Sequence, residues 1–565
     1  MPDFSYRDAL ACAISAARQA GAALRQELHR EGGPRGPHGH CPADLEVEAL
    51  IREHLDASFP AFGLRGEEQP ELNRLPALGE RHCWLVDPND GTTSMQNGFR
   101  GSAVSIGLIC DEEPVLGVIF AYAAPDDDGD LIAWALGEGP VTRNGAPLPP
   151  RIWPEALSAA DTVLLSQQAD TRPEAHAARV APARYRPIPG IAYRLALVAA
   201  GEGVAALSLF GPRDFDYAAG HALLRGAGGV LLDHRGREVK YLLERERSLI
   251  FCFGGGPAIA RALVDADWDG LLRVHPVATE PFDLVWPQAG TLVEDAGRVC
   301  RAQGAMLGQL IGNALGGQPA ELAVLLARAI IDRGHYDEKY AARAYAHALR
   351  TGPDDLEEMT AGALIRIGPL GIFGAGLLET SSSILTSFAR ADASLTHADV
   401  ACQDANAVFV MTIARAISSG ATGRELYEAA RNDAREMGAC AEVKTWLEEA
   451  LESPPTEGAS PAGALRFALI NAFSRLRTGQ SAERAVEETV GMGGYSAANA
   501  AICGVLLGAA QGREAWPMKW RDRVLTFRPI EGAPDISRPR PRAVWAVDAL
   551  VLAERLLFHG RAVSI

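Results

Sequence analysis

The sequence predicts a protein of two domains, an N-terminal α/β layered domain followed by an all-α domain. Three observations support this division. The 565 residues exceed the usual length of one domain. Hydrophobic residues make up 48% of the chain, which is enough for two cores. Strand-like alternation is present in the first half and nearly vanishes from about Pro287, where helical periodicity takes over.

The first half contains the expected strands and helices of the layered domain. The runs Val104–Ile109 and Val115–Tyr122 are separated by a short acidic turn and predict a β-hairpin. A helix is expected to open at Asp214 and to end at Gly228–Gly229. The glycine cluster Gly254–Pro257 predicts a turn before a helix, because it lacks the Lys-Ser/Thr that a phosphate loop needs.

The second half is expected to be helical after a short join. We predict domains at residues 1–272 and 290–565, joined by a proline-containing segment at residues 273–289. Ala- and Leu-rich runs such as Ala320–Ile330 carry polar residues at helical intervals. The stretch Arg538–Arg542 is expected to be an extended surface segment, and the last helix is expected to start near Ala543.

The most informative run of the chain is Asp87–Ser94, which follows the apolar Trp84–Val86. A strand that delivers Asp87 and Asp90 and then breaks into a Gly-Thr-Thr turn places oxygen ligands beside backbone N–H groups. Mg²⁺ takes such ligands and commonly shares its shell with phosphate oxygens. N–H groups at a turn or helix start bind the anion itself. The run therefore indicates a metal site built for phosphate.

Two acids at longer range support this interpretation. Glu67 lies about 20 residues upstream of Asp87, and Asp216 lies in the first turn of the helix that opens at Asp214. Taken singly, Asp216 is typical of a helix N-terminus, and Asp87 and Asp90 are typical of turns. Together, their order and spacing favour one shared metal site.

These motifs resemble the signature of the inositol-monophosphatase-like phosphatases, and residues 1 to about 272 look like one complete member. The signature is Gly-Glu-Glu, then Asp-Pro-x-Asp-Gly-Thr, then Trp-Asp-x-Ala-Ala-Gly, with Phe215 here in place of the Trp. The resemblance implies the fold shared with fructose-bisphosphatase, two or three Mg²⁺ ions, and inhibition by Li⁺. The metal-site residues that it implies are Glu67, Asp87, Asn89 through its main-chain carbonyl, Asp90, Thr92 and Asp216, with Asp44 ordering a weaker metal.

The resemblance also implies how the reaction would proceed. Gly91, Thr92 and Thr93 would hold the phosphate, with Glu67 and the Thr92 hydroxyl activating the attacking water. Asp90, also a predicted catalytic residue, would clamp the leaving-group metal together with Asp216.

Departures from the family pattern leave the substrate open. Relatives usually carry a Lys and an Asp-x-Val-Thr segment before the Asp44 helix, but here the loop is glycine-rich. Either Arg35, His38 or His40 replaces the Lys, or the third metal is weak. The residues assigned to a substrate pocket are Gly190, Ala192 and Asp214. A sugar phosphate, an inositol phosphate and a phosphoadenosine or ADP-ribose-related phosphate all remain candidates.

Residues of about 290 to 530 resemble the ADP-ribosylglycohydrolase family. The segments that carry this second resemblance are Arg301–Gly316, Gly362–Gly371, Thr396–His397 and Val490–Gly494. Active relatives hold two Mg²⁺ with a Thr-Asp-Asp-Ser/Thr run and an Asp-x-Asp-Thr run. This chain has neither run, and the family's Gly-Asp-Ala-Leu-Gly has become Gly312–Gly316 with Asn313.

The loss of so many carboxylates predicts a helical domain that no longer catalyses. Asp404, His397 and Arg366 survive, and each is expected to be a buried, satisfied polar residue. Two roles stay open for this domain: it binds an ADP-ribose-like ligand, or it serves as a dimerisation and regulatory surface. Residual ADP-ribosyl hydrolysis ranks lowest.

Composition restricts the partners and the compartment. The net charge of -17 disfavours nucleic-acid binding. Nine cysteines without a Cys-x-x-Cys pair are typical of a reducing cytoplasm. No signal peptide is recognised, and no apolar run is expected to span a membrane. With nucleic acid and membranes disfavoured, the partners expected are a small phosphorylated metabolite, an ADP-ribose-like ligand at the helical domain and a second copy of the chain.

The leading hypothesis is an Mg²⁺-dependent phosphomonoesterase. The alternative is a binding or regulatory protein, in which the phosphatase fold senses a phosphorylated metabolite and the helical domain recognises ADP-ribosyl groups.

Overall fold

The computed structural model describes residues 5–316, 320–351, 362–452, 454–455, 463–533, 536 and 538–562. The chain divides into two compact units. Unit 1 extends to Val277 and includes Pro287–Gly290 and a short segment from Gly532. Unit 2 contains Ala278–Trp286, the chain from Thr291 to Glu531, and the chain from Ile536 onward. Unit 1 is α/β and unit 2 is helical, so the two predicted fold classes are confirmed.

Unit 1 is built on two β-sheets. In the seven-stranded sheet the strands follow the order of the chain, and only β1 and β2 pair in parallel. These strands are β1 (Gly63–Gly66), β2 (His82–Asp90), β3 (Ala103–Cys110), β4 (Glu113–Ala121), β5 (Asp130–Ala135), β6 (Thr142–Arg143) and β7 (Ala146–Pro147). The predicted hairpin is confirmed, because β3 pairs with β4 and places Val104 opposite Phe120.

The second sheet has five strands in the order β11-β12-β10-β8-β9. Its parallel strands are β8 (Thr162–Leu165), β9 (Arg184–Pro187) and β10 (Ala205–Ser208), and its antiparallel additions are β11 (Val230–Asp233) and β12 (Cys252–Gly255). The predicted turn at Gly254–Pro257 is therefore wrong in its first half, where Gly254 and Gly255 are strand residues. A Cβ on Gly254 would collide with the side chain of Leu195, so close packing of a helix on the sheet explains the glycine.

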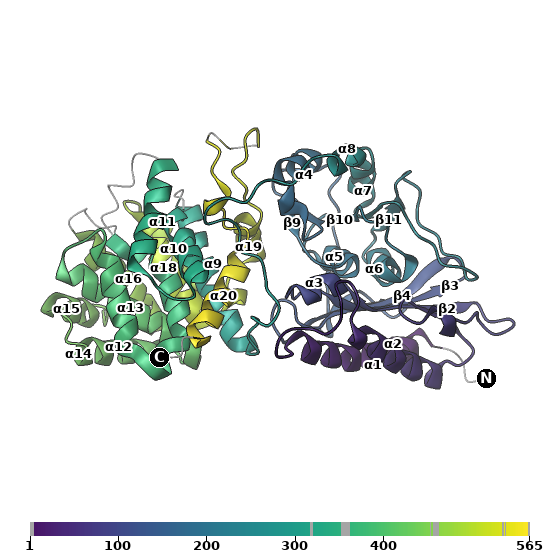
Figure 1. The fold of residues 1–565 in the computed structure, drawn as a ribbon, viewed down its shortest axis with the longest axis horizontal. Coiled ribbons are helices and arrows are strands. Elements are labelled where there is room, and N and C mark those ends of the chain that lie inside the picture. Colours follow the sequence, from purple (N-terminus) through teal and green to yellow (C-terminus); the bar gives the residue numbers. More distant parts are fainter. Residues whose placement is uncertain are drawn as a thin grey trace. The chain divides into compact units, whose positions relative to one another are not determined.

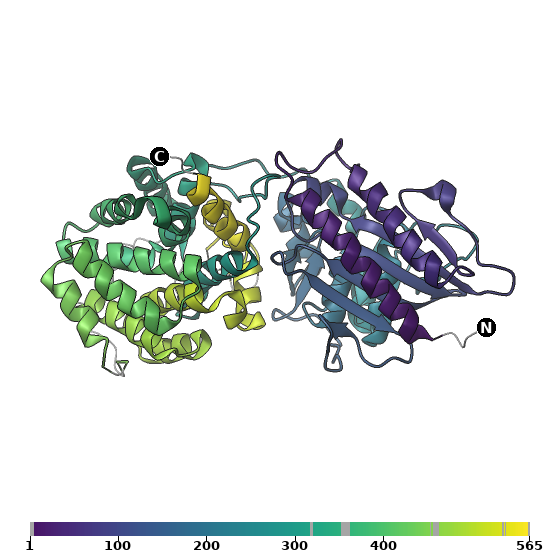
Figure 2. The ribbon, with the colours of Figure 1, turned by 90° about the horizontal axis from the view of Figure 1, so that it is seen from below.

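Helices form three layers around these sheets (Figure 1). The helices α1 (Tyr6–Leu28) and α2 (Pro42–Ser58) lie side by side on the outer face of the seven-stranded sheet, as Figure 2 shows from below. The helices α5 (Ile191–Ala200) and α6 (Asp214–Gly226) lie between the sheets. Residues 191–199 are all buried, which matches their nearly uniform apolar sequence.

The remaining helices of unit 1 are short. The single-turn α3 (Thr92–Gln96) follows β2, and the outer layer on the second sheet contains α4 (Pro173–Val180), α7 (Pro257–Val264) and α8 (Trp268–Leu272). The order of layers is thus helix, sheet, helix, sheet, helix. This order brings the ends of β1 and β2 next to the start of α6.

Unit 2 contains no strand among its described residues. Its helices are α9 (Ala296–Leu315), α10 (Glu321–Arg333), α11 (Glu338–Thr351), α12 (Gly368–Ser394), α13 (Val400–Ser419), α14 (Gly423–Glu436), α15 (Ala441–Glu449), α16 (Ala464–Thr478), α17 (Ala482–Gly491), α18 (Ser496–Gln511), α19 (Met518–Leu525) and α20 (Ala549–Ala562). Among the described residues, α13 alone is long and apolar enough to cross a membrane by length and composition, and 78% of its apolar window is buried inside the protein.

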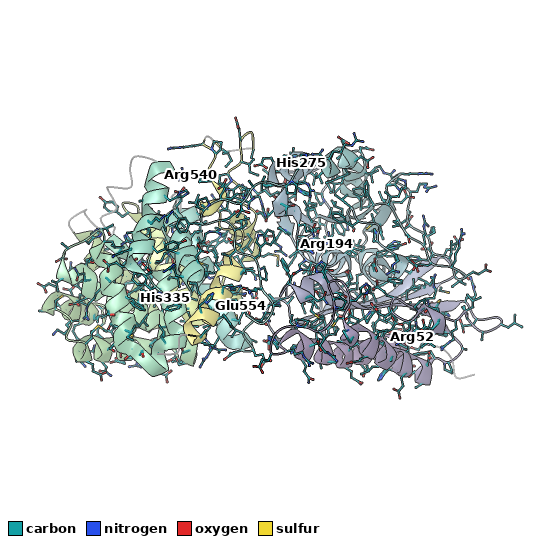
Figure 3. All side chains as sticks on the ribbon, in the orientation of Figure 1. Arg52, Arg194, His275, His335, Arg540 and Glu554 are labelled. Atoms are coloured by element: carbon teal, nitrogen blue, oxygen red, sulfur yellow. The ribbon has the colours of Figure 1, made fainter. Side chains whose placement is uncertain are left out.

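The structure corrects two expectations near the C-terminus. Arg540, labelled in Figure 3, pairs with Glu321, and Arg542 pairs with Asp283 at 2.6 Å, so these two arginines are largely buried rather than solvated. The last α-helix starts at Ala549, because residues 542–544 form a separate 3-10 turn.

Candidate metal centre

Three separate segments of unit 1 bring carboxylates together. Glu67 follows β1, Asp87 lies in β2, and Asp216 lies in the first turn of α6. One carboxylate oxygen from each lies within 4.8 Å of the other two. We call these three residues the carboxylate cluster.

A bulge in β2 accounts for the placement of its two aspartates. Asp87 is opposite Ser105 and Asp90 is opposite Ala103, so β2 has one residue more than β3 in this interval. Such a bulge bends a strand and redirects its side chains. The Asn89 backbone N–H donates to Asp87 Oδ1 at 2.8 Å and fixes that carboxylate at the end of the strand.

Asp90 is held by the start of α5. The Ala192 backbone N–H donates to Asp90 Oδ2 at 2.5 Å. Gly190 has a φ of 62°, and a Cβ at this position would lie 2.8 Å from the same oxygen. Gly190 and Ala192, which the sequence assigned to a substrate pocket, therefore contact Asp90. The buried guanidinium of Arg194, labelled in Figure 3, donates to the Gly190 carbonyl at 2.9 Å.

A hydrogen-bonded network joins Asp44 to the turn after β2. Asp44 accepts from the Thr92 hydroxyl at 2.7 Å and from the Asn89 amide at 3.0 Å. The hydroxyl of the buried Tyr122 donates to Asn89 Oδ1 at 2.9 Å. The Asn89 carbonyl lies 3.3 Å from the Thr92 hydroxyl. Asn89 and Thr92 are thus fixed in orientation beside the carboxylate cluster.

The site concentrates negative charge in a buried environment. Burial, and then the charge of Glu67, raise the pKa of Asp87 and Asp216 well above the ordinary value. Burial also raises the pKa of Asp90 to about 7 and that of Asp44 to about 7. Like charges in a buried site are unfavourable without a counter-ion. The all-oxygen donor set fits a hard divalent cation such as Mg²⁺.

The residues predicted to hold phosphate lie at the start of α3. Gly91 has a φ of 104° and precedes the helix, Thr92 and Thr93 form its first turn, and the Ser102 hydroxyl donates to the Gly91 carbonyl at 2.8 Å. The side chain of Gln96 bonds the backbone of the glycine-rich loop, accepting from the Gly39 N–H at 2.7 Å.

The contacts of the loop before α2 bear on which residue could replace the Lys that the family usually carries there. Arg35 forms ion pairs with Glu27 at 2.9 Å and with Glu46 at 3.1 Å, so its charge is already matched. His38 and His40 are exposed.

Two positioning residues were not predicted from the sequence. Glu48 is fully buried in α2 and accepts from the Glu68 N–H at 2.7 Å and from Arg52 at 2.8 Å, which fixes the loop that carries Glu67. Its spacing of four residues from Asp44 places both acids on one helix face and was an available signal. Arg213 forms an ion pair with Glu67, and nothing in the local pattern indicated this contact.

Asp214 does not line an open pocket. Its side chain is fully buried and pairs with Arg65 at 2.9 Å. Arg65 lies two residues before Glu67, and Asp214 lies two residues before Asp216. The pair therefore ties the two segments that supply these ligands, and Asp214 is a positioning residue rather than a pocket residue.

Each of the three polar residues that survive in unit 2 has a partner within that unit. Arg366 pairs with the fully buried Asp392 at 2.9 Å, and Asp404 pairs with Arg390 at 2.9 Å. His397 bonds the Thr396 hydroxyl at 2.8 Å. Within the described part of the chain, unit 2 has no group of three or more His, Cys, Asp or Glu side chains placed to hold a metal ion.

The comparisons with known proteins agree with both units. Residues 5–251 match the inositol monophosphatase family, and residues 294–555 match ADP-ribosylglycohydrolase. Inositol monophosphatase 1 of Solanum lycopersicum is 30% identical over 256 residues, which are 43% of this chain and 90% of the relative. Inositol monophosphatase 3 of the same plant is 29% identical over 41% of this chain and 89% of the relative.

Two further matches are partial or distant. The uncharacterized protein y4fL of Sinorhizobium fredii is 34% identical over 194 residues, and the match spans 33% of this chain but only 63% of that protein. The solved inositol monophosphatase of Anabaena is 23% identical, with a TM-score of 0.36, over 48% of this chain and 98% of that one.

The fold and the site together define a layered α/β domain with a candidate metal centre made of carboxylates. The chain belongs to the inositol monophosphatase family. Membership of this family supports the classification of the chain as a phosphatase, which is a kind of hydrolase.

Proposed function

We propose that unit 1 is an Mg²⁺-dependent phosphomonoesterase that hydrolyses a small phosphorylated metabolite. The observation that carries the proposal is that Glu67, Asp87 and Asp216 meet from three distant segments, with the half-buried Asp90 beside them. Family membership supports the same activity. The substrates considered are sugar phosphates, inositol phosphates and phosphoadenosine or ADP-ribose-related phosphates.

Each residue of the site has a defined task in this proposal. Glu67, Asp87, Asp90, Asp216 and the Asn89 carbonyl would hold Mg²⁺, which supplies Lewis-acid polarisation of the phosphate and a more acidic water. The Thr92 hydroxyl donates its proton to Asp44, so its oxygen remains free to accept from the attacking water. Glu67 orients the same water.

The proposal is tested by phosphate release from a panel of phosphorylated metabolites with Mg²⁺ and with EDTA. We expect release from at least one compound with Mg²⁺ and none with EDTA. If no compound is hydrolysed by correctly folded protein, the binding or regulatory alternative becomes the better account. Calorimetric titration of the same panel would then identify the ligand that is sensed.

We propose that unit 2 does not catalyse. The support is the pairing of Arg366 and Asp404 with internal partners and the lack of a metal-holding group in the described residues. The roles considered for this unit are binding of an ADP-ribose-like ligand and contact with a second copy of the chain.

A further inference from the structure

Arg194 is a buried cation in the first turns of α5. The residue is 5% exposed, and Figure 3 labels its position in unit 1. Its Nε donates to the Gly190 carbonyl at 2.9 Å, and its Nη1 donates to the Leu207 carbonyl at 2.6 Å. Neither acceptor is a carboxylate. Burial of a guanidinium without a directly bonded carboxylate is unfavourable, so a gain elsewhere must offset this cost.

The bond from Nε to Gly190 strengthens the start of α5. Gly190 precedes the helix with a φ of 62°, and its carbonyl also accepts from the backbone N–H of Arg194. This first bond of the helix is long, at 3.4 Å, whereas the bond from the side chain to the same carbonyl is 2.9 Å. The side chain of Arg194 therefore closes a turn that the backbone alone closes weakly.

The same turn holds the carboxylate of Asp90. The N–H groups in the first turn of a helix have no partner inside the helix, and the Ala192 N–H donates to Asp90 Oδ2 at 2.5 Å. An added Cβ on Gly190 would lie 2.8 Å from that oxygen, so the turn and the carboxylate are in close contact. A shift of the turn would therefore shift Asp90.

The second bond of Arg194 anchors this turn to a strand. Leu207 lies in β10, and the chain after β10 leads into α6, which carries Asp216 in its first turn. Arg194 thus joins the turn that holds Asp90 to the strand that precedes Asp216. Both acids are predicted ligands of the leaving-group metal.

We propose that Arg194 is a positioning residue of the phosphatase reaction, which acts through the Gly190 turn to orient Asp90 for the metal. Hydrogen-bonded groups behind a ligand carboxylate commonly set its orientation and the affinity for the ion. This inference rests on the proposed phosphatase function.

The test compares two uncharged substitutions of similar length, Arg194→Gln and Arg194→Met, in the full chain. Counted along the side chain, the amide nitrogen of glutamine stands where arginine has Nε, and it can donate to the Gly190 carbonyl. The terminal methyl of methionine stands at the same place and cannot donate. Both substitutions remove the charge and the bond to Leu207, so the variants differ in the donor to Gly190.

The first readout uses Mg²⁺ alone and follows the melting temperature during titration. The half-saturating Mg²⁺ concentration should be about tenfold higher for Arg194→Met than for Arg194→Gln, because a freely moving ligand carboxylate binds the ion less tightly. The second readout is phosphate release from the panel compound that the wild type hydrolyses, measured well below the lowest melting temperature. Here kcat should be about tenfold lower for Arg194→Met, with KM differing less than about twofold.

Arg186→Met is the control for loss of stability alone. Arg186 lies in β9, its side chain is 13% exposed, and it pairs with Glu202 at 2.8 Å, beyond the C-terminal end of α5. This variant should melt at a lower temperature than the wild type and keep both its Mg²⁺ half-saturation and its kcat.

The outcomes separate this inference from the proposed function. Equal Mg²⁺ half-saturation or equal kcat in Arg194→Gln and Arg194→Met would overturn the role of Arg194 while leaving the phosphatase intact. Should Arg194→Met not fold, Arg194→Gln is compared with the wild type: similar values support the role, and a loss of about tenfold overturns it. If the wild type hydrolyses no compound, the proposed function fails and the Mg²⁺ titration still decides whether Arg194 orients Asp90.

Discussion

Asp90 is the residue whose loss should cost most in activity. It is half-buried, its charge acts on Asp87 and Asp216, and the Ala192 N–H fixes its carboxylate. Asp90→Asn keeps the shape but removes a charge, so phosphate release should fall by at least about a hundredfold, since lost transition-state stabilisation is worth several kcal/mol. Phosphate release under saturating Mg²⁺ provides the measurement, with circular dichroism as the check on folding.

The exposed Asp265, at the end of α7, provides the matched control for this change. Asp265→Asn removes the same charge outside the site and should retain full activity. Near-normal turnover in Asp90→Asn would contradict the assignment of Asp90 to the metal centre.

The acids of the site predict how stability depends on pH. Asp90 and Asp44 each have a pKa of about 7 in the folded chain, against about 3.9 for an unfolded aspartate. Their protonated forms favour the folded state, so this contribution is complete below pH about 4 and is lost as the pH rises through 7. Without divalent ions, the melting temperature should therefore fall between pH 5 and 8.

Mg²⁺ should reverse this trend, because the ions bind the deprotonated acids. The gain in melting temperature on adding Mg²⁺ should grow from pH 5 to pH 8. A gain that is independent of pH would show that these carboxyls do not titrate with metal binding.

At the residue scale the sequence predicted the acids but not their partners. Local motifs alone were enough to predict the chemistry of four acids, Glu67, Asp87, Asp90 and Asp216. The contact of Arg213 with Glu67 joins residues 146 positions apart. Such pairing depends on how β1 and α6 meet, which no local pattern encodes.

The turn before α5 should control the site through backbone geometry. Gly190→Ala adds a Cβ that would lie 2.8 Å from Asp90 Oδ2 on a backbone with φ of 62°. Activity should fall at least about tenfold because Asp90 must move, and stability should fall by about 1 kcal/mol or more. Kinetic assays and thermal melting measure the two effects.

Gly228→Ala provides the control for backbone strain. Gly228 has a φ of 76°, but its nearest neighbour to an added Cβ is the Trp153 indole nitrogen at 3.7 Å. This variant should lose similar stability and keep its activity. Equal losses of activity in the two variants would show that strain alone, not the contact with Asp90, is responsible.

At the element scale the apolar strands and the helix at Asp214 could be predicted from the sequence, but the residues at which elements begin and end could not. The pairing of β3 with β4 followed from two apolar runs around a turn. The start of the last helix was misplaced by six residues, at Ala543 instead of Ala549. The ion pair of the buried Arg542 with Asp283 explains this error. From sequence alone a charge-rich stretch is expected to be exposed, because its distant carboxylate partner is not apparent.

At the scale of the whole molecule, the phosphatase unit should need the segment Pro287–Gly290. This segment belongs to unit 1, where an added Cβ on Gly98 would lie 2.6 Å from the Gln288 backbone. A fragment of residues 1–290 should therefore melt a few degrees above a fragment of residues 1–272. The variant Gly98→Ala should destabilise the longer fragment more than the shorter one, and equal effects would contradict this role.

The helical unit should release no ADP-ribose from ADP-ribosylated protein. No acidic metal-holding group is present in its described residues, and Asp404 and Arg366 are paired internally. Chromatographic detection of free ADP-ribose, with Asp90→Asn to silence unit 1, provides the measurement. Release that persists in that variant and disappears in Asp404→Asn would show catalysis by unit 2.

The close approach of α9 and α18 shows what holds the fold of unit 2 together without a metal ion. An added Cβ on Gly304, Gly308 or Gly312 would collide with the backbone of α18, and Gly504 and Gly508 face α9 in the same way. This seam is made of main chain against main chain, so its strength owes nothing to bound ions or to acidic side chains. A change of acidic residues outside the seam would therefore leave it intact, whereas a side chain at any of these five glycines would force the two helices apart.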